Sequence, residues 1–321
     1  MKQEVETVPP KILVVAGPTA SGKTKLAVEL ALRHNGEVVS ADSMQIYRTL
    51  DIGTAKPTVQ EMQGIPHHML DVVEPEEDFS VARYVEMASV CIDDILSRGK
   101  LPVLAGGTGL YIDSLLSGRT FAAFSSENSL RSRLQERAQQ EGSAVLWQEL
   151  EKVDPESAAR LHPNDEKRII RALEVWEQTG MTITEHNRMT QSLPPRYDAL
   201  TIGLRFARRE DMWERINRRV DEMMQQGLVD EVRTVLERGI PADCTAMQAI
   251  GYKEMVQAVM TGGDVLEAAE EVKLRSRQYA KRQLTWFRRN RETKWHEWTE
   301  RPDFQAALRA STDYMEEFGI V

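Results

Sequence analysis

The chain has 321 residues and a formal net charge of −9, and 41% of its residues are hydrophobic and 28% are charged. This composition is typical of a globular protein and excludes collagen-like, low-complexity and membrane-embedded classes. No apolar run approaches the length of a membrane-spanning helix, and residues 1–10 lack the apolar centre of a secretory signal, so we expect a cytoplasmic protein with no membrane partner. Cys91 and Cys244 have no C-x-x-C partner or nearby histidine pair, and we expect both to be buried as small apolar residues.

The first predicted elements are a strand, a loop and a helix in series. The apolar, β-branched run Lys11–Ala16 leads directly into the pattern G-x-x-x-x-G-K-T, and an amphipathic helical pattern follows at Lys23–Arg33. This order is that of a phosphate-binding loop, because Gly17 and Gly22 let the backbone turn tightly and point its amide groups, with the positive end of the helix, at one anion. The loop consists of Gly17, Pro18, Thr19, Ala20, Ser21, Gly22, Lys23 and Thr24.

Two side chains of this loop carry chemistry of their own. Lys23 supplies a mobile ammonium group for phosphate oxygens, and Thr24 supplies a hydroxyl group that suits Mg²⁺. The loop binds phosphate through backbone dipoles, so it does not determine what the phosphates are attached to. The sequence therefore predicts a bound diphosphate or triphosphate, with Mg²⁺ as the cofactor.

A second strand, predicted at Glu37–Ala41, ends in Asp42. If this strand lies beside the phosphate loop, the Asp42 carboxylate reaches the mouth of the loop, where it could hold Mg²⁺ through water or accept a proton from an attacking group. The plainer alternative is that Asp42 only caps the turn that follows. Ser43, Met44 and Gln45 combine hydrogen-bonding and apolar groups, a mixture that suits a flipped-out base better than a sugar.

Two histidines and a second glycine-rich turn follow. His67 and His68 raise a metal site as an alternative, but neighbours in sequence rarely point the same way and no third ligand is evident, so this segment is predicted to place a loop against the substrate. A helix is predicted at Val81–Arg98 and a strand at Leu101–Ala105, which runs into Gly-Gly-Thr-Gly at 106–109. Because ligands of open α/β sheets collect at the carboxyl ends of the strands, this turn and the phosphate loop are expected to face one crevice.

The alternation of strands and helices, with a further strand at Ala199–Phe206, predicts an α/β fold in which a parallel sheet like that of P-loop NTPases carries helices on both faces. Between 125 and 195 the β-branched runs disappear and helical periodicity takes over, so we expect a mainly helical insertion domain there. The core domain then comprises residues 1–124 and 196–321. A short strand is predicted at Thr293–Trp298.

A predicted helix at Met212–Gln226 has an apolar face and a basic face. Arg215 and Arg219 stand one turn apart on the basic face, either as solvated surface charges or as a clamp on a diphosphate. The opposite face, expected to be buried, consists of Trp213, Ile216, Val220 and Met223.

The last long helix carries the strongest local charge of the chain. Between Glu270 and Arg291, eight basic residues stand against two acidic ones, and this basic stripe on an acidic protein indicates a nucleic-acid partner. Helical spacing places Arg277, Lys281 and Arg288 in a row that could follow a phosphate backbone, although a solvated charged face is the alternative. The side expected to face the core consists of Val272, Tyr279, Ala280, Trp286 and Phe287.

Seven segments together resemble the tRNA dimethylallyltransferase family, also called the tRNA isopentenyltransferases. The phosphate loop alone is shared by many unrelated proteins, but the ordered combination is specific. The segments are GPTASGKT (17–24), SADSMQIYR (40–48), DIGTAKP (51–57), IPHHMLD (65–71), GGTGLY (106–111), AIGYKE (249–254) and RQYAKRQLTWFRR (277–289).

The resemblance implies transfer of a dimethylallyl group from dimethylallyl diphosphate to N6 of the adenosine just 3′ of the anticodon, tRNA position 37, with release of diphosphate. Asp42 is then the candidate base for the adenine amino group, and Thr108 is the residue that orients it. Lys23, Arg215 and Mg²⁺ stabilise the leaving diphosphate. The contacts to the tRNA anticodon stem-loop that follow are Asp42, Ser43, Met44, Gln45, Thr108, Glu166, Lys167, Arg168, Ile169, Ile170, Gln248, Gly251, Tyr252, Arg277, Lys281 and Arg288.

Two other functions remain open at this point. A small-molecule kinase would bind ATP on the same loop, but the sequence shows no evident cluster of lid arginines and no adenine-binding motif. A non-catalytic RNA-binding module would use the loop as a switch, and Asp42 and Lys23 would then be dispensable for turnover.

Overall fold

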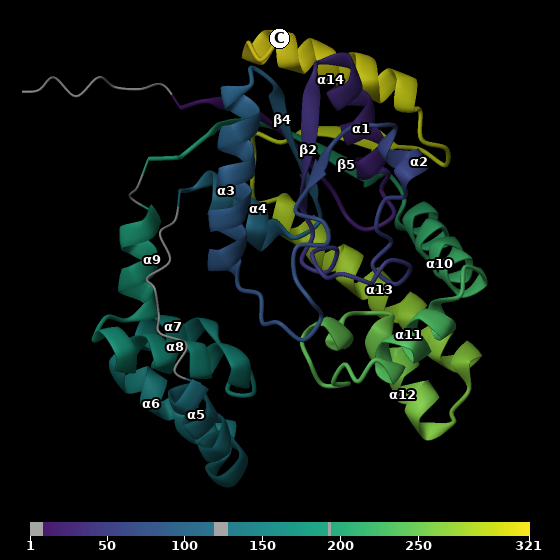
Figure 1. The fold of residues 1–321 in the computed structure, drawn as a ribbon. Coiled ribbons are helices and arrows are strands. Elements are labelled where there is room, and N and C mark those ends of the chain that lie inside the picture. Colours follow the sequence, from purple (N-terminus) through teal and green to yellow (C-terminus); the bar gives the residue numbers. More distant parts are fainter. Residues whose placement is uncertain (1–8, 119–127, 192–193) are drawn as a thin grey trace, which may run out of the picture. The chain divides into compact units, whose positions relative to one another are not determined.

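The computed structural model describes residues 9–118, 128–191 and 194–321, which divide into two compact units (Figure 1). The first unit combines the residues up to Leu116 with Arg196–Val321, and the second spans Ser117–Pro195. The sequence placed the first of these boundaries between residues 124 and 125. That position falls in 119–127, outside the described residues.

The described part of the first unit is built on a six-stranded sheet with the order β3-β2-β4-β1-β5-β6 (Figure 1). All of its strand pairs are parallel, so the predicted parallel α/β sheet is confirmed. The sequence missed β3, which has only two residues and therefore gives no pattern. The strands are β1 (Lys11–Ala16), β2 (Gly36–Ala41), β3 (His67–His68), β4 (Leu101–Gly106), β5 (Asp198–Phe206) and β6 (Lys294–Trp298).

Helices cover both faces of the sheet because successive side chains of each strand point to opposite sides. Leu13 and Val15 pack in one buried cluster with side chains of α1 and α14, whereas Ile12 and Val14 pack in another with α3 and α4. None of the described helices is long and apolar enough to cross a membrane. The helices of this unit are α1 (Lys23–Arg33), α2 (Val59–Met62), α3 (Val81–Ser97), α4 (Gly109–Leu116), α10 (Arg209–Gln225), α11 (Leu228–Glu237), η1 (Ala246–Gln248), α12 (Tyr252–Thr261), α13 (Val265–Phe287) and α14 (Phe304–Phe318).

The register of the strands β1, β4 and β2 determines which loops lie together at the carboxyl ends of the strands. Ala16 of β1 and Ala41 of β2 both pair with Gly106 of β4, so the three strands end at the same level. The strand that carries Asp42 is not the direct neighbour of the phosphate-loop strand, because β4 lies between them, but the shared level of the strand ends still brings Asp42 to the edge that carries the loop. The close approach of β4 to β2 at this point needs a glycine at position 106, since a Cβ atom there would lie 2.1 Å from the Ala41 carbonyl oxygen.

The second unit is mainly helical, as the sequence predicts, and has its own buried cluster that includes Leu134, Leu146 and Leu150. A buried carboxylate also orders it: Asp154 accepts hydrogen bonds from the Ser157 backbone N–H and from the backbone N–H and hydroxyl of Thr184. Its helices are α5 (Asn128–Glu141), α6 (Ser143–Val153), α7 (Pro155–Arg160), α8 (Glu166–Thr179) and α9 (Ile183–Gln191).

Some predicted core residues are placed as expected and others are not. Cys91 and Cys244 are free thiols, partly buried beside the apolar clusters. Met212, Ile216 and Val220 form the buried face of α10. Trp213, however, is 37% exposed, and the Arg209 guanidinium group lies over its ring, so the prediction that this indole is buried is wrong.

A buried ionic cluster joins the strands at the opposite end of the sheet. The Glu37 carboxylate on β2 accepts hydrogen bonds from the Arg98 guanidinium group and, at 2.7 Å, from the Lys100 ammonium group. His68 Nε2 lies 2.8 Å from the same carboxylate, and His67 Nδ1 lies 2.9 Å from the Ile65 carbonyl oxygen. Both histidines thus have local partners, and the described residues contain no group of three or more side chains suited to a metal ion.

We expect Glu37→Gln to lower the free energy of unfolding by roughly 1–2 kcal/mol, because it removes the buried carboxylate that accepts charge-assisted hydrogen bonds from the partly exposed Arg98 and Lys100. The hydrogen bonds from Arg98 and the other partners hold the pKa of Glu37 far below its usual value of 4.5. The stabilisation is therefore complete above about pH 4.5 and disappears as the pH falls toward the folded-state pKa. Urea unfolding from pH 3 to 8 measures this, with exposed Glu86→Gln on α3 as the control; equal stabilities of Glu37→Gln and wild type would contradict it.

Candidate functional site

The phosphate loop follows β1 and turns tightly before α1. A Cβ atom on Gly17 would lie 2.8 Å from the Ser21 hydroxyl oxygen, and Gly22 has φ +87° with the Phe304 ring against its Cα. Ala20 also takes a left-handed conformation, with φ 61°. These constraints explain why glycine stands at both ends of the loop, and they give the local geometry that the sequence predicts.

Lys23 begins α1 and lies back along the loop, where its ammonium group donates to the Pro18 carbonyl oxygen at 3.4 Å. Burial lowers its pKa to about 8, the Asp42 carboxylate partly opposes this shift, and the Arg219 guanidinium group adds to it. The side chains of Lys23, Asp42 and Arg219 therefore share one electrostatic environment.

Both arginines of the basic face of α10 point at the site. Arg215 Nε donates to the Ala20 carbonyl oxygen at 3.2 Å, which places its guanidinium group on the phosphate loop. Arg219 donates to the Ala55 carbonyl oxygen, and burial lowers its pKa as it does that of Arg215. Neither is a solvated surface charge, so the alternative that the sequence left open is excluded by their positions.

Asp42 leaves β2 at the same edge. Its Oδ1 accepts hydrogen bonds from the backbone N–H groups of Met44 at 2.9 Å and Gln45 at 3.4 Å, so Asp42 does cap the following turn. Thr108 stands beside this turn, where its hydroxyl oxygen accepts from the Ser43 N–H at 3.1 Å and its own N–H donates to the Ala41 carbonyl oxygen. The turns after β2 and β4 are thus joined, and they place Asp42 and Thr108 together.

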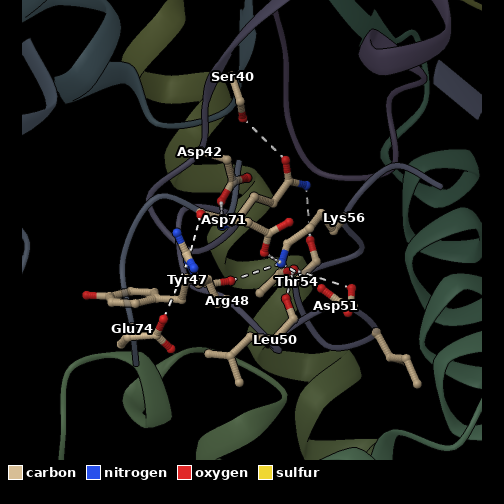
Figure 2. Close-up of polar contacts among 12 residues, drawn as sticks. Ser40, Asp42, Tyr47, Arg48, Leu50, Asp51, Thr54, Lys56, Asp71 and Glu74 are labelled. Atoms are coloured by element: carbon tan, nitrogen blue, oxygen red, sulfur yellow. Dashed lines mark hydrogen bonds and ion pairs between the residues drawn. The ribbon is translucent and has the colours of Figure 1, made fainter. Parts of the chain in front are cut away.

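The loop that follows Asp42 is held by its own polar groups (Figure 2). Gln45 donates to the carbonyl oxygens of Thr54 and Ala55 and accepts from the Ser40 hydroxyl group. Its amide is therefore engaged within the loop, which argues against the base contact predicted for it. Met44 is partly buried against the apolar cluster below the loop.

A buried lysine ties the same loop together from the other side. The Lys56 side chain is 6% exposed, and its ammonium group contacts the carboxylates of Asp51 and Asp71 at 2.6 and 2.5 Å and donates to the Tyr47 carbonyl oxygen (Figure 2). Lys56 comes from the DIGTAKP segment, and its role is structural.

Tyr252 is completely buried under the DIGTAKP segment, where its hydroxyl group donates to Glu231 on α11. The Glu231 carboxylate also accepts from the consecutive backbone N–H groups of residues 51–53. This burial argues against the predicted contact of the Tyr252 side chain with tRNA, because its ring is covered and its hydroxyl group already bonds to Glu231. Gly251 is buried as well, whereas Gln248 is exposed.

The segment predicted to contact tRNA in the second unit is the first turn of α8. Ile169 and Ile170 are 0% and 4% exposed in the core of this unit, which argues against the predicted contacts of these side chains with tRNA. Lys167 and Arg168 are exposed and Glu166 is partly exposed. Arg168 pairs with Asp165 at 2.9 Å.

Several basic side chains of α13 are paired with other residues of the protein and are therefore less free to bind RNA than the sequence predicts. Lys273 pairs with Asp221 of α10 and with Glu270, and Arg275 pairs with Glu271. Asp221, which lies outside the segment 270–291, thus compensates part of the net charge of +6 that eight basic and two acidic residues give this segment. The row of three cations also divides, because Arg277 donates to Asn217 at 2.6 Å, whereas Lys281 and Arg288 are exposed.

Sequence reasoning missed two side chains that fix the phosphate loop. Gln283 of α13 is 6% exposed and accepts a hydrogen bond from the Thr19 N–H, which is thereby directed at this helix. Trp298 of β6 is buried, and its indole N–H donates to the Ser21 carbonyl oxygen at 2.8 Å. The signals for Gln283 were its place in the segment RQYAKRQLTWFRR and a polar side chain on the apolar side of a helix.

The fold and the site define a class: a P-loop α/β protein in which cations, a carboxylate and a threonine meet at the carboxyl edge of a parallel sheet. Family models described as IPP transferase and isopentenyl transferase match residues 45–290 and 10–78. A tRNA dimethylallyltransferase of Caldanaerobacter subterraneus is 50% identical over 286 residues, 89% of this chain and 91% of the relative. That of Acetivibrio thermocellus is 45% identical over 309 residues, 96% of this chain and 98% of the relative.

Solved structures give the same result. A tRNA isopentenylpyrophosphate transferase of Bacillus halodurans is 40% identical, with a TM-score of 0.71, over 97% of this chain and 98% of that one. A eukaryotic dimethylallyltransferase, whose crystal structures capture it acting on tRNA, is 30% identical, with a TM-score of 0.81, over 96% of this chain and 80% of that one. The chain belongs to the tRNA dimethylallyltransferase family, as its motifs predict.

Proposed function

We propose that this chain transfers the dimethylallyl group of dimethylallyl diphosphate to N6 of the adenosine at position 37 of tRNA and releases diphosphate. The observation that carries the proposal is the shared end of β1, β4 and β2, which brings the phosphate loop, Thr108 and Asp42 to one edge. The names of the relatives support it, since each is a tRNA dimethylallyltransferase or isopentenyl transferase.

The cations of the site suit the leaving group. When the allylic C–O bond breaks, charge accumulates on diphosphate, and groups that are fixed before the reaction stabilise it without reorganising. Lys23 and Arg215 both hydrogen-bond to the phosphate loop itself, and Arg219 lies in the same environment. The backbone amides of Gly22, Lys23 and Thr24 at the start of α1 and these three cations form the proposed diphosphate site.

The residues present also fit Mg²⁺. Thr24 offers a hydroxyl group in the first turn of α1, and Mg²⁺ is typically bound by one or two protein oxygens with the rest supplied by water and substrate phosphates. Mg²⁺ bound there would neutralise charge on the diphosphate. We propose Thr24 as its protein ligand.

The remaining residues suit the nucleophile. An adenine amino group is a poor nucleophile because its lone pair is delocalised into the ring, so a base must take its proton as the C–N bond forms. Asp42 uses Oδ1 to cap its turn, and in our proposal Oδ2 accepts this proton. Thr108, held against the same turn by Ser43, orients the amino group.

Labelled substrates test the proposed function directly. Unmodified tRNA is incubated with Mg²⁺ and either radiolabelled dimethylallyl diphosphate or γ-labelled ATP, and the product nucleoside is identified after digestion. We expect only the prenyl label to enter RNA, at the adenosine 3′ of the anticodon, and a tRNA with guanosine there serves as the control. Label from ATP in any acceptor would favour the kinase, and RNA binding without transfer would favour the non-catalytic module.

The exposed cations of α13 give a separate prediction about tRNA binding. Lys281→Ala with Arg288→Ala should reduce the magnitude of the slope of log affinity against log salt by roughly 0.7–0.9 for each phosphate that these side chains neutralise. Filter binding of tRNA across a salt series measures the slope. Replacement of two exposed arginines elsewhere, Arg33→Ala with Arg309→Ala, is the matched control; equal slopes in the two double variants would mean that tRNA lies away from α13.

A further inference from the structure

One buried amide bridges the two loops of the site. The side chain of Gln283 accepts a hydrogen bond from the Thr19 N–H of the phosphate loop at 2.9 Å and donates one to the Gly107 carbonyl oxygen at 2.9 Å. The two partners fix its orientation, because a backbone N–H requires the amide oxygen and a backbone carbonyl requires the amide nitrogen. Only a carboxamide of this length can satisfy both.

The same side of α13 holds the Thr108 turn at further points. A Cβ atom on Gly107 would lie 2.3 Å from the Gln283 amide nitrogen, and the indole of Trp286 lies equally close to the next glycine of the turn. Tyr279, one helical turn before Gln283, lies on the same side of the helix, and the side chains of Thr108 and Gln283 both oppose the rise in its pKa that burial causes. Gln283 and Trp286, on one side of this helix, therefore hold the turn, and Gln283 also reaches the phosphate loop.

The outward side of the same helix carries the exposed Lys281, and the exposed Arg288 caps its C-terminal end. Figure 1 shows α13 as one continuous helix that runs past α4 to α12, and it spans Val265–Phe287 without a break. An RNA phosphate bound to the outward side would limit the movement of α13. Because Gln283 lies on the buried side of the same helix, the movement of its amide would be limited as well.

We propose that Gln283 is a positioning residue: it sets the spacing between the phosphate loop and the Thr108 turn, and RNA bound to α13 acts through it to tighten the binding of diphosphate. The second part rests on the proposed function, because it requires RNA on this helix. In this proposal Gln283 acts through the backbone groups of Thr19 and Gly107 that it contacts. Because coupling is reciprocal, diphosphate must tighten RNA binding by the same factor.

The coupling factor is measured by calorimetry or fluorescence as the ratio of the diphosphate Kd without and with a saturating anticodon stem-loop RNA. We expect a factor of about 5 or more for wild type, the lower end of typical couplings. Gln283→Met preserves length and apolar contact but removes both hydrogen bonds, and it should reduce the factor to near 1 while leaving the Kd for RNA alone within about threefold. Inorganic diphosphate is the probe, so the test needs no transfer.

Gln278→Met is the matched control, because it makes the same substitution at an exposed position of the same helix, and it should keep the wild-type factor. If Gln283→Met does not fold, Gln283→Glu retains the acceptor for Thr19 and loses only the donor to Gly107, and it should also lose the coupling. A wild-type factor near 1, or an unchanged factor in either Gln283 variant, overturns the proposal. Transfer by wild type in the labelling assay is read separately, so failure of the proposed activity is distinguishable from failure of the coupling.

Discussion

Asp42→Asn should lower the rate of prenyl transfer by about 10²–10⁴-fold, the usual contribution of a general base. Asparagine retains the side-chain oxygen that caps the turn through the N–H groups of Met44 and Gln45, so the fold of the loop is preserved. Only the negative charge and the basicity are lost. Because that charge faces Lys23 and Arg219, its loss should leave diphosphate binding unchanged or slightly tighter.

This substitution separates the two roles that Asp42 can have. If Asp42 serves only as a cap, the asparagine variant caps the turn equally well and turnover stays at the wild-type rate. Single-turnover measurements at saturating tRNA and dimethylallyl diphosphate report the chemical step. Asp42→Ala is the companion variant, since it removes both the cap and the base and should also weaken binding.

Local structure was predictable where a short segment determines it. The phosphate loop and α1 follow from β-branched residues, two glycines and an amphipathic repeat that are consecutive in the chain. The order of the strands is a different matter, because the pattern of each strand carries no information about its neighbour. For this reason the position of β4 between β1 and β2 could not be derived from the sequence.

The site was predicted in part for the same reason. Helical periodicity correctly placed Arg215 and Arg219 on one face of α10, but it could not identify Ala20 and Ala55 as their partners, which lie far away in the sequence. Trp213 shows the limit of periodicity at the rim of a helix, where a one-residue rotation exchanges a buried position for an exposed one.

Residues carried over from the family motifs show a second limit. Motifs mark positions that matter, but they do not distinguish a residue that touches the substrate from one that supports the site. Tyr252 and Gln45 stand in such motifs, and in the structure both are engaged within the protein. Gln283 also lies in a motif, and its proposed function became evident only in the structure, where its amide bonds to both the phosphate loop and the turn after β4.

Lys23→Ala should weaken diphosphate binding and also slow transfer by about 10²–10³-fold, because an ammonium group fixed at the leaving group contributes most when that group gains charge. The pH dependence of the diphosphate affinity shows whether the Lys23 ammonium group is responsible. Burial lowers the pKa of Lys23 to about 8, so the charged form that attracts diphosphate prevails below pH 8 and is lost above it. Affinity should therefore be flat up to about pH 8 and then fall by up to tenfold per pH unit.

The alanine variant provides the reference for that profile. Ionisation of the ligand and of other groups affects both proteins equally, so the ratio of wild-type to Lys23→Ala affinity isolates the lysine. Arg219 and Asp42 are the charged groups that face Lys23, and neither is altered by the substitution. Calorimetric titration of diphosphate from pH 6.5 to 9.5 gives the ratio. A ratio near 1 at every pH would mean that the Lys23 ammonium group lies away from the bound diphosphate, and the proposed leaving-group site would have to be rebuilt around Arg215 and Arg219. A large ratio that does not change with pH would instead contradict the lowered pKa of Lys23.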